Sequence, residues 1–492
     1  MPDIQNLLHK FIVKFLLQKM EIIHVSAECY PMAKVGGLAD VVGALPKYLQ
    51  TLGHIAKVVI PMHRTKFLYE NDWEVVHKGN FSMEKMNFDF TVIKEKENKL
   101  GFDLYCIDIY GLLDREKVYG YDDDTERFVA FQISVLEWIN KWEHLPDVIH
   151  VHDHHAALIP FMMQECFAYG KLKQIATVLT IHNAQYQGWM AWEKAAYLPA
   201  WNTWKWGMLD WSNIVNPLAC GIKCADAVNT VSPGYMLELM KDANGLESLF
   251  QAEGFKCSGI INGIDYKVWN PLTDTYILDN FSVKDYTEGK ALNKKKLCHD
   301  FVLDLNLPLF VFIGRLVQEK AADLLPEAIN NALKLYKGKL NFLILGSGDP
   351  EVEKELTDLL NEHVGYYSSQ ITYNEKLSHL MYAGADFLLM PSRVEPCGLN
   401  QLYAMRYGTV PVVRRTGGLK DTVLDIDEQN GYGLCFDYAS LIDIDISIQR
   451  ALELFEDKIK MKEIRKTMME IDNSWTASAQ QYTTLYQSVK QK

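Results

Sequence analysis

Several features of the 492-residue sequence are scarce, and each scarcity excludes a class of protein. The nine cysteines are odd in number, run from Cys29 to Cys435, and include no C-x-x-C pair. This spacing favours reduced thiols in a cytoplasmic protein over a disulfide framework. Residues 1–19 are apolar in part, but Lys14 interrupts them and they are too short to span a membrane. We interpret them as an amphipathic extension rather than a targeting segment.

Positive charge is also in deficit. The chain has 50 Lys and Arg against 63 Asp and Glu, which gives a formal net charge of -13. Nucleic acids and anionic membranes are normally bound by an exposed basic surface, so neither is an expected partner. Any phosphate site must therefore be local. The sequence does not indicate an oligomeric state.

The residues that are present predict an α/β fold. Hydrophobic residues make up 48% of the chain, and the length exceeds what one core usually organises, so we expect two domains with a cleft between them. Short β-branched runs alternate with amphipathic helical stretches, which is typical of parallel, doubly wound Rossmann-like sheets. The expected strands are 22–27, 56–60, 148–151, 176–181 and 227–231 in the first half, and 309–313, 342–345, 387–390 and 410–413 in the second. Helices are expected at 38–52 and 156–169.

We predict four segments along the chain. They are an N-terminal extension (1–19), a first Rossmann-like domain (20–270), a second Rossmann-like domain (287–473) and a C-terminal helical segment (474–492). The hinge is placed between Asn270 and Thr287, and a polar, lysine-rich stretch, Thr287–Asp300, precedes the second series of strands. The C-terminal helix could pack against either half, including a return to the first domain.

A glycine-rich loop follows the first expected strand, at Lys34-Val-Gly-Gly-Leu-Ala-Asp40. Gly36 and Gly37 would let backbone amides approach phosphate oxygens, while the helix N-terminus and Lys34 supply positive charge. An ordinary strand-to-helix turn with a solvated lysine is the alternative.

The second half offers comparable features. Arg315 and Lys320 follow the strand at 309–313, and Arg414-Arg-Thr-Gly-Gly-Leu419 ends a later strand with paired glycines. Because ligands bind beyond the carboxyl ends of parallel strands, these cations are expected to meet a diphosphate. A departing nucleotide diphosphate is stabilised either by a metal or by fixed cations and amide dipoles, and this sequence offers the latter.

Metal and dinucleotide sites are less favoured. Three D-x-D strings, at 122–124, 425–427 and 443–445, lie in acidic patches that we interpret as solvated. The histidines of His150-Val-His-Asp-His-His155 lack a usual zinc arrangement, and Asp153 is better interpreted as an acceptor for sugar hydroxyls. Gly346-Ser-Gly-Asp-Pro350 departs from the dinucleotide fingerprint. For the tryptophans at positions 201, 204, 206 and 211, sugar stacking and core packing both remain open.

Together these motifs resemble the bacterial glycogen synthase and plant starch synthase family, which has the two-domain GT-B architecture. The resemblance runs from Met20 to about Tyr486 and includes Thr180-Ile-His-Asn183, Ile261-Asn-Gly-Ile-Asp265 and Glu395-Pro-Cys-Gly-Leu399. It implies a retaining transferase that adds glucose from ADP-glucose to the non-reducing end of an α-1,4-glucan without a metal or cofactor. The first domain would then serve the acceptor and the second the nucleotide sugar.

The resemblance also implies roles for individual residues. The residues expected to take part in catalysis are His182 beside the anomeric carbon, Glu395 against the glucose ring, Asp153 near hydroxyls, and the phosphate-binding cations Arg315 and Lys320. The residues expected to bind substrate are Lys34, Gly36, Gly37, Asp40, Asn262, Tyr373 (stacked on the base), Cys397, Gly398, Leu399, Thr416, Gly417 and Gly418. Same-face attack and a covalent intermediate both stay open.

Three positions depart from the family pattern. Ala321 replaces the glycine that usually follows the second cation, His154 stands where tryptophan is common, and Val394 stands where an aromatic residue is common. A transferase that uses UDP-glucose or another acceptor is one alternative function. A catalytically silent glucan-binding scaffold is the other, and the retained Lys34 and Glu395 argue against it.

Overall fold

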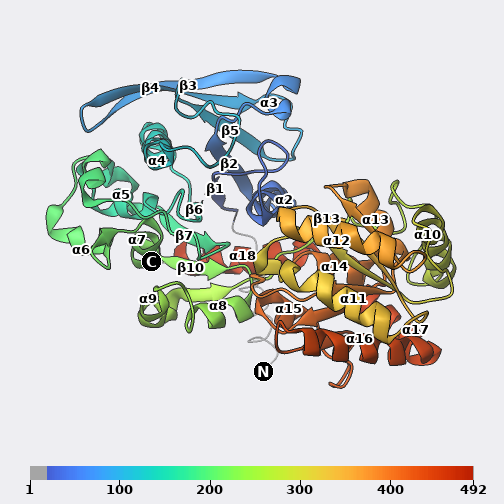
Figure 1. Cartoon of the computed structure of the whole chain (residues 1–492). Coiled ribbons are helices and arrows are strands. Elements are labelled where there is room, and N and C mark those ends of the chain that lie inside the picture. The colour runs from blue at the N-terminus through green and yellow to red at the C-terminus, as the bar shows by residue number, and fades with distance from the viewer. Residues whose placement is uncertain (1–18, 491–492) are drawn as a thin grey trace, which may run out of the picture. The chain divides into compact units, whose positions relative to one another are not determined.

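The computed structural model describes residues 19–490, so the predicted extension lies outside the described residues except for Lys19. The chain forms two compact units, each built on one large sheet (Figure 1). Of the described residues, the first unit holds those up to Val231, residues 236–260 and those from Trp475 to Lys490; the second holds 232–235 and 261–474. The expectation of an α/β fold with two parallel-sheet domains is confirmed.

The first unit contains a nine-stranded sheet in the order β11-β10-β7-β6-β1-β2-β5-β4-β3. Seven strands run parallel, whereas β4 is antiparallel to both β5 and β3. The strands are β1 (Glu21–Val25), β2 (Ile55–Pro61), β3 (Trp73–Met83), β4 (Met86–Glu95), β5 (Asp103–Asp108), β6 (Val148–His152), β7 (Ala176–Ile181), β10 (Ala227–Thr230) and β11 (Cys257–Gly259). A separate pair joins β8 (Asp210–Trp211) and β9 (Ile214–Val215).

The helices that accompany this sheet are short except for three. They are α2 (Gly37–Thr51), α3 (Lys66–Glu70), α4 (Asp124–Ile139), α5 (Ile159–Glu165), α6 (Trp206–Leu209), α7 (Pro217–Cys224), α8 (Pro233–Leu239), α9 (Glu247–Ala252) and α18 (Trp475–Lys490). The 3₁₀ turns are η1 (Phe167–Gln174), η2 (Trp192–Tyr197), η3 (Thr203–Lys205) and η4 (Gly254–Lys256). The single helix expected at 156–169 is wrong: α5 ends at Glu165 because Cys166 takes an extended conformation, and η1 follows.

The C-terminal helix α18 belongs to the first unit and contacts α2 and β7. Its buried residues, among them Trp475, Tyr482 and Tyr486, join the core formed by β1, β6 and α2. Tyr486 also lies 2.8 Å from His150 on β6 through its hydroxyl group. The last helix of the chain is therefore part of the core of the domain that the chain forms first.

The second unit is a six-stranded, wholly parallel sheet in the order β14-β13-β12-β15-β16-β17. Its strands are β12 (Leu309–Ile313), β13 (Asn341–Gly346), β14 (Tyr367–Ile371), β15 (Phe387–Met390), β16 (Val410–Arg414) and β17 (Leu434–Phe436). Its helices are α10 (Tyr286–Asp300), α11 (Leu325–Leu335), α12 (Pro350–Glu362), α13 (Glu375–Gly384), α14 (Asn400–Arg406), α15 (Gly417–Thr422), α16 (Leu441–Glu456) and α17 (Lys458–Glu470), with 3₁₀ turns η5 (Gln318–Lys320) and η6 (Ala322–Leu324).

The compact units change at Ile261, ahead of the predicted hinge between Asn270 and Thr287. Residues 261–286 lie in the second unit because their side chains bond to its helices. Asp274 is buried and accepts hydrogen bonds from His379, at 2.6 Å, and from the Tyr407 hydroxyl group. Trp269 stacks on His379 with ring centroids 3.9 Å apart.

The lysine-rich stretch at 287–300 forms α10, and some of its lysines point inward. The Lys290 ammonium group is buried and donates to three backbone carbonyl oxygens and to Thr409 Oγ1 at 2.8 Å. Lys294 pairs with buried Asp386 at 2.7 Å. Four acceptors around the Lys290 Nζ atom offset the cost of removing it from water, so Lys290 and Lys294 have a structural role.

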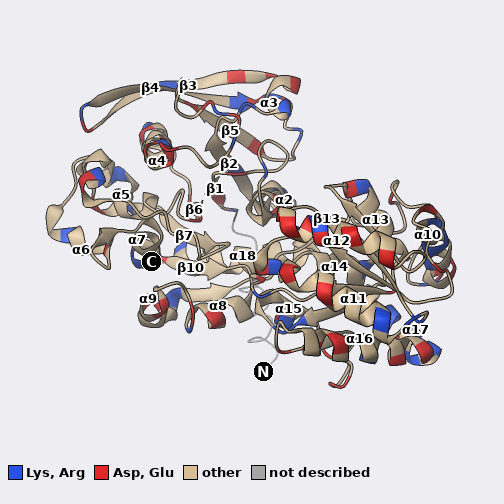
Figure 2. Ribbon diagram, in the orientation of Figure 1, with Lys and Arg blue, Asp and Glu red and all other residues tan. Residues whose placement is uncertain are grey.

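Charged side chains of both signs are interspersed over the helices of each unit rather than gathered into a basic face (Figure 2). Among residues 19–490, no helix has both the length and the apolar character needed to cross a bilayer.

Candidate active site

The loop between β1 and α2 is held by Glu28. Its Oε2 atom accepts hydrogen bonds from the amides of Val35, at 2.5 Å, and Gly36, at 3.1 Å, while Oε1 accepts one from the Tyr119 hydroxyl group at 2.7 Å. Burial raises the pKa of Glu28. Glu28 was not among the predicted site residues, although a carboxylate just after the first buried strand is a signal in the sequence.

The predicted anion cradle is thus shaped by a carboxylate of the chain itself. The Gly36 amide donates to Glu28, and Gly37 begins α2. Lys34 Nζ lies 2.6 Å from Asp40 Oδ1 and 5.2 Å from the centre of the Tyr30 ring. Four predicted substrate-binding residues of this unit therefore lie in one short loop and the first turn of the helix: Lys34, Gly36, Gly37 and Asp40.

Asp153 and His182 follow the neighbouring strands β6 and β7. Asp153 Oδ1 accepts a hydrogen bond from the His182 amide at 2.7 Å. The Asp153 backbone has φ of 54°, in the left-handed region, which stores about 1 to 2 kcal/mol in an L-residue. Burial raises the pKa of Asp153 to about 7. The structure therefore brings these two predicted residues together and gives Asp153 a loop-fixing contact.

The His182 side chain is 9% exposed. Its Nε2 atom lies 3.1 Å from His152 Nδ1, so the ring is tied to the interior of the sheet. Burial lowers the pKa of His182 to about 3, which keeps the imidazole neutral near pH 7.

Lys320 and Glu395 form the central pair of the second unit. Lys320 Nζ donates to both carboxylate oxygens of Glu395 at 2.6 Å, and Ser392 Oγ donates to Oε2 at 2.9 Å. The two residues follow β12 and β15, which are neighbours in the sheet. The amides of Arg393 and Val394 donate to the Glu319 carbonyl oxygen, at 2.8 and 3.1 Å, and join the two loops.

Arg315 lies in the same loop as Lys320 but points to solvent. Its side chain is 64% exposed, and its guanidinium group is 3.4 Å from Glu319. An exposed, weakly paired guanidinium group can turn toward an anion with little loss of existing contacts. The structure places this predicted cation close to Lys320 in the chain without holding it in one position.

The glycines of the loop after β16 are required by close packing against the Glu395 segment. A Cβ atom on Gly417 would lie 2.1 Å from the Glu395 carbonyl oxygen, and one on Gly418 would lie 2.1 Å from that of Cys397. The Gly418 amide donates to the Glu395 carbonyl oxygen at 3.1 Å. Thr416 is buried at the N-terminus of α15.

The remaining predicted binding residues of this unit lie around the same segment, with one exception. Cys397 is buried and accepts a hydrogen bond from the Asn262 amide. Gly398 has φ of 72°, and Leu399 precedes the first turn of α14. Tyr373 follows β14, at the edge of the sheet, and is 77% exposed, so it is available for stacking but is not fixed by packing.

The acidic strings have partners of their own. Asp425 and Asp427 both lie 2.6 Å from Arg450, and Asp443 accepts a hydrogen bond from the Tyr438 amide at 2.7 Å. Carboxylates that are paired with a cation or an amide are poor candidates for a metal loop.

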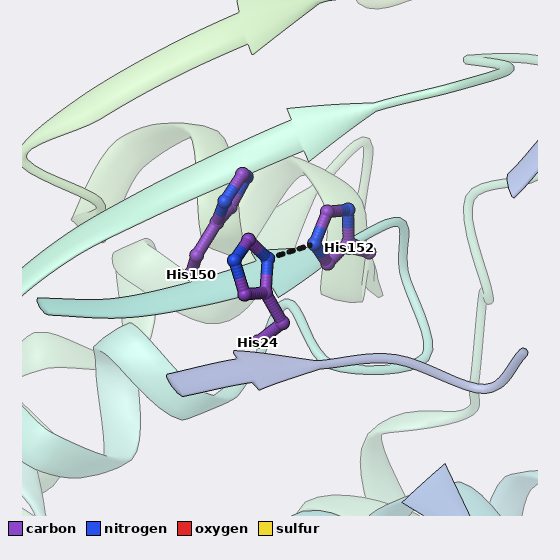
Figure 3. A group of neighbouring side chains, drawn as sticks. All are labelled: His24, His150 and His152. Atoms are coloured by element: carbon purple, nitrogen blue, oxygen red, sulfur yellow. Dashed lines mark hydrogen bonds between the residues drawn. The ribbon is translucent and has the colours of Figure 1, made fainter. Parts of the chain in front are cut away.

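Figure 3 shows a buried group of three histidines, His24, His150 and His152. Among the described residues these are the ones close enough to hold a metal ion, with candidate nitrogens within 4.8 Å of one another. However, the rings of His150 and His152 are stacked, with centroids 4.2 Å apart and planes 29° apart. Because the nitrogen lone pairs lie in the ring planes, stacked rings do not aim at one ion. Hydrogen bonding fits the group better than metal binding.

The structure places the tryptophans in different surroundings. Trp201 lies against buried Phe161, with ring centroids 5.5 Å apart, and Trp211 donates to the Gly245 carbonyl oxygen at 2.8 Å. Trp204 is 92% exposed. Trp201 is thus a packing residue, whereas Trp204 lies on the surface.

Known proteins resemble the chain over nearly its full length. A model of the starch synthase catalytic domain matches residues 21–252, and a model of glycosyl transferases group 1 matches residues 294–467. A glycogen synthase from Flavobacterium johnsoniae is 53% identical over 473 residues, covering 96% of this chain and 100% of that protein. A glycogen synthase from Hydrogenobaculum is 35% identical over 491 residues, covering 96% and 99%.

Solved structures agree. The catalytic domain of starch synthase IV from Arabidopsis thaliana, bound to ADP and acarbose, superposes with a TM-score of 0.86 at 30% identity and covers 96% of this chain and 100% of that chain. Sucrose-phosphate synthase from Thermosynechococcus elongatus superposes with a TM-score of 0.61 at 17% identity, covering 96% and 99%, which shows the fold alone.

Two doubly wound domains with these loops define a glycosyltransferase of the GT-B class. Within that class, the 53% identity to the Flavobacterium glycogen synthase extends over 96% of this chain. The chain belongs to the glycogen synthase and starch synthase family.

The backbone at Ala321 explains the glycine that is usual at this position in the family. Ala321 has φ of 54° and is fully buried. We expect Ala321→Val to lower the free energy of unfolding by about 2 to 3 kcal/mol, because a β-branched residue resists the left-handed region and overfills the site. Ala321→Gly should change it by less than about 1 kcal/mol, since relief of strain offsets the lost methyl group. Urea denaturation of both variants tests this, and a valine variant as stable as the parent would contradict it.

Asp153 predicts a pH-dependent stability. Because its pKa is about 7 in the fold and about 3.9 in an unfolded chain, the folded protein keeps a proton that the unfolded chain loses. The contribution of Asp153 to stability therefore decreases as pH rises from about 4 to 7. Asp153→Asn keeps the acceptor oxygen but removes the charge, so the variant should gain stability relative to the parent between pH 5 and pH 8.

The measurement is urea denaturation of both proteins at these two pH values. Asp122→Asn, which removes an exposed carboxylate, is the control and should show no such gain. A stability difference for Asp153→Asn that is equal at both pH values would contradict the prediction.

Proposed function

We propose that the chain transfers glucose, with retention of configuration, from ADP-glucose to the non-reducing end of an α-1,4-glucan, and that it needs no metal or cofactor. The observation that carries this proposal is the buried Glu395 carboxylate, 6% exposed, with both oxygens held by Lys320 at the carboxyl ends of adjacent strands. The Arabidopsis relative bound to ADP and acarbose supports both the nucleotide and the glucan.

In this proposal the leaving diphosphate is stabilised by two cations, of which Lys320 is held in place and Arg315 is exposed. Arg315 would bind it with an exposed guanidinium group, and Lys320 with an ammonium group whose position Glu395 already fixes. The family resemblance gives Lys34 the same role. A cation held before the reaction needs no reorganisation when charge develops, which is how electrostatic stabilisation lowers a barrier.

The sugar is assigned to Glu395 and His182. Positive charge develops at the anomeric carbon, and a buried carboxylate lowers the energy of that state. Glu395 is suited to this because two cationic hydrogen bonds and the Ser392 hydroxyl group keep it in one orientation. Asp153 would act on the sugar chiefly through the loop that carries His182.

A cytoplasmic location belongs to the same proposal. All nine cysteines are free thiols, and most are buried, as expected where thiols stay reduced.

Two alternative functions can be compared with the structure. A donor with another base remains compatible with an exposed Tyr373, because stacking does not identify a base. A silent scaffold is disfavoured by the Lys320–Glu395 pair, since a binding surface has no need of a buried carboxylate held by a half-buried lysine at this edge of the sheet.

The test is incorporation of labelled glucose into glycogen from ADP-glucose and UDP-glucose in excess chelator. We expect ADP-glucose to be the better donor and the activity to survive the chelator. Glu395→Gln should lower turnover on the order of 10² to 10³-fold, because the shape is kept and the charge is lost. Glu351→Gln, in the first turn of α12, is the matched control and should be as active as the parent.

Equal use of both donors would favour the UDP-glucose alternative, and loss of activity in chelator would contradict the metal-free proposal. Glycogen binding without incorporation from either donor would favour the scaffold.

A further inference from the structure

A row of polar side chains crosses one buried face of the first sheet. His24 on β1 is opposite His150 on β6, and His152, two residues further along β6, is opposite Thr180 on β7. All four side chains are fully buried. Side chains two residues apart on a strand share a face, so the row continues from β1 to β7, as Figure 3 shows for its histidines.

Hydrogen-bond rules fix the direction of the bonds around His150. The Thr180 hydroxyl group donates to Asn229 Oδ1, so it must accept from His150 Nε2, 2.6 Å away. A neutral imidazole has one N–H group, which leaves His150 Nδ1 bare to accept from the Tyr486 hydroxyl group at 2.8 Å. Asn229 completes this chain with a bond to Tyr482 at 3.2 Å. The hydrogen bonds of His150 therefore connect β6 to α18.

A second chain leads toward the site. His24 Nδ1 lies 3.1 Å from His152 Nε2, and His152 Nδ1 lies 3.1 Å from His182 Nε2. Burial lowers the pKa of His24 and of His182 to about 3 and that of His152 well below its usual value. Three neutral rings share two bonds, and each bond needs one N–H group. Only two patterns satisfy this: all three rings protonated on Nδ1, or all three on Nε2.

The far end of the chain selects between the patterns. His24 Nε2 is buried and has no hydrogen-bond partner. If it carried the proton, an N–H group would be buried without an acceptor, which native structures avoid more strictly than an unused acceptor. Because His24 Nε2 is bare, the His24 proton lies on Nδ1. The pattern with all three rings protonated on Nδ1 is then the one that applies, so His152 and His182 also carry their protons on Nδ1.

We propose that His24 and His152 are positioning residues that fix His182 as the Nδ1–H tautomer. His182 then offers an N–H donor on the nitrogen that does not face His152, and its bare nitrogen, Nε2, is already occupied by the His152 N–H group, so neither nitrogen is free to accept a proton from the substrate. In the transfer reaction His182 would donate a hydrogen bond to a sugar oxygen and would not act as a general base. This role in the reaction rests on the proposed function; the tautomer does not.

Nitrogen NMR of protein labelled at histidine nitrogens tests the tautomer directly, because protonated and bare ring nitrogens have separate shifts. Spectra of the single variants at positions 24, 152 and 182 assign the signals. We expect a protonated Nδ1 and a bare Nε2 in all three rings of the parent protein. A bare Nδ1 in His182 would overturn the proposal, whether or not the protein transfers glucose.

Two substitutions at His152 test positioning. His152→Leu removes the bond to His182 and should lower kcat about tenfold or more with KM for ADP-glucose unchanged, the effect of one lost charge-neutral hydrogen bond on the transition state. His152→Asn places an amide N–H group where Nδ1–H was, so it should restore most of kcat and keep the His182 tautomer.

His150→Asn is the matched control, since His150 is equally buried on the same strand but bonds to Tyr486 and Thr180. It should lower thermal stability and leave kcat and the His182 signal unchanged. If His152→Leu kept full kcat, or if His150→Asn lowered kcat as much, the positioning role would be wrong while a transferase activity stood.

Discussion

Buried carboxylates at strand ends hold the loops of the candidate site. Glu28 accepts two backbone amides of the loop before α2, Asp153 accepts the His182 amide, and Glu395 accepts both bonds from Lys320. A buried carboxylate is costly unless its oxygens are bonded. Each acid therefore requires its loop to keep one conformation, and the loop in turn keeps the acid in place.

The same requirement explains why the polar interior of the first sheet continues into the site. Burial keeps these histidines neutral, so each ring has one N–H group, and each hydrogen bond between two rings uses one of them. The tautomer of one ring therefore determines the tautomer of the next. There are two series of hydrogen bonds: one connects His150 to α18, and the other connects His24 through His152 to His182. A side chain at the site is thereby coupled to a residue two strands away in the sheet.

Much of this could be predicted from the sequence because it depends on local patterns. Periodic apolar runs predicted nine of the parallel strands but not β5, β11, β14 or β17. Glycine pairs next to cations predicted the loops at residues 34–37 and 416–418. The antiparallel ribbon of β3 and β4 was not foreseen, since its residues are half exposed and interspersed with charges. The inward direction of Lys290 on α10 was not foreseen, because it depends on acceptors about 90 or more residues later. Glu28 and the histidine chain depend on pairings between distant segments, which no local pattern contains.

In the proposed reaction, cations of the second unit bind the nucleotide without a metal. The measurement is a calorimetric titration of ADP in excess chelator into the parent protein, Arg315→Met and the control Lys354→Met, which removes an exposed lysine on α12. We expect binding to the parent and the control, and affinity about tenfold or more weaker for Arg315→Met, the value of one charged hydrogen bond. Equal affinity for all three proteins, or binding that appears only when a divalent cation is added, would contradict this proposal.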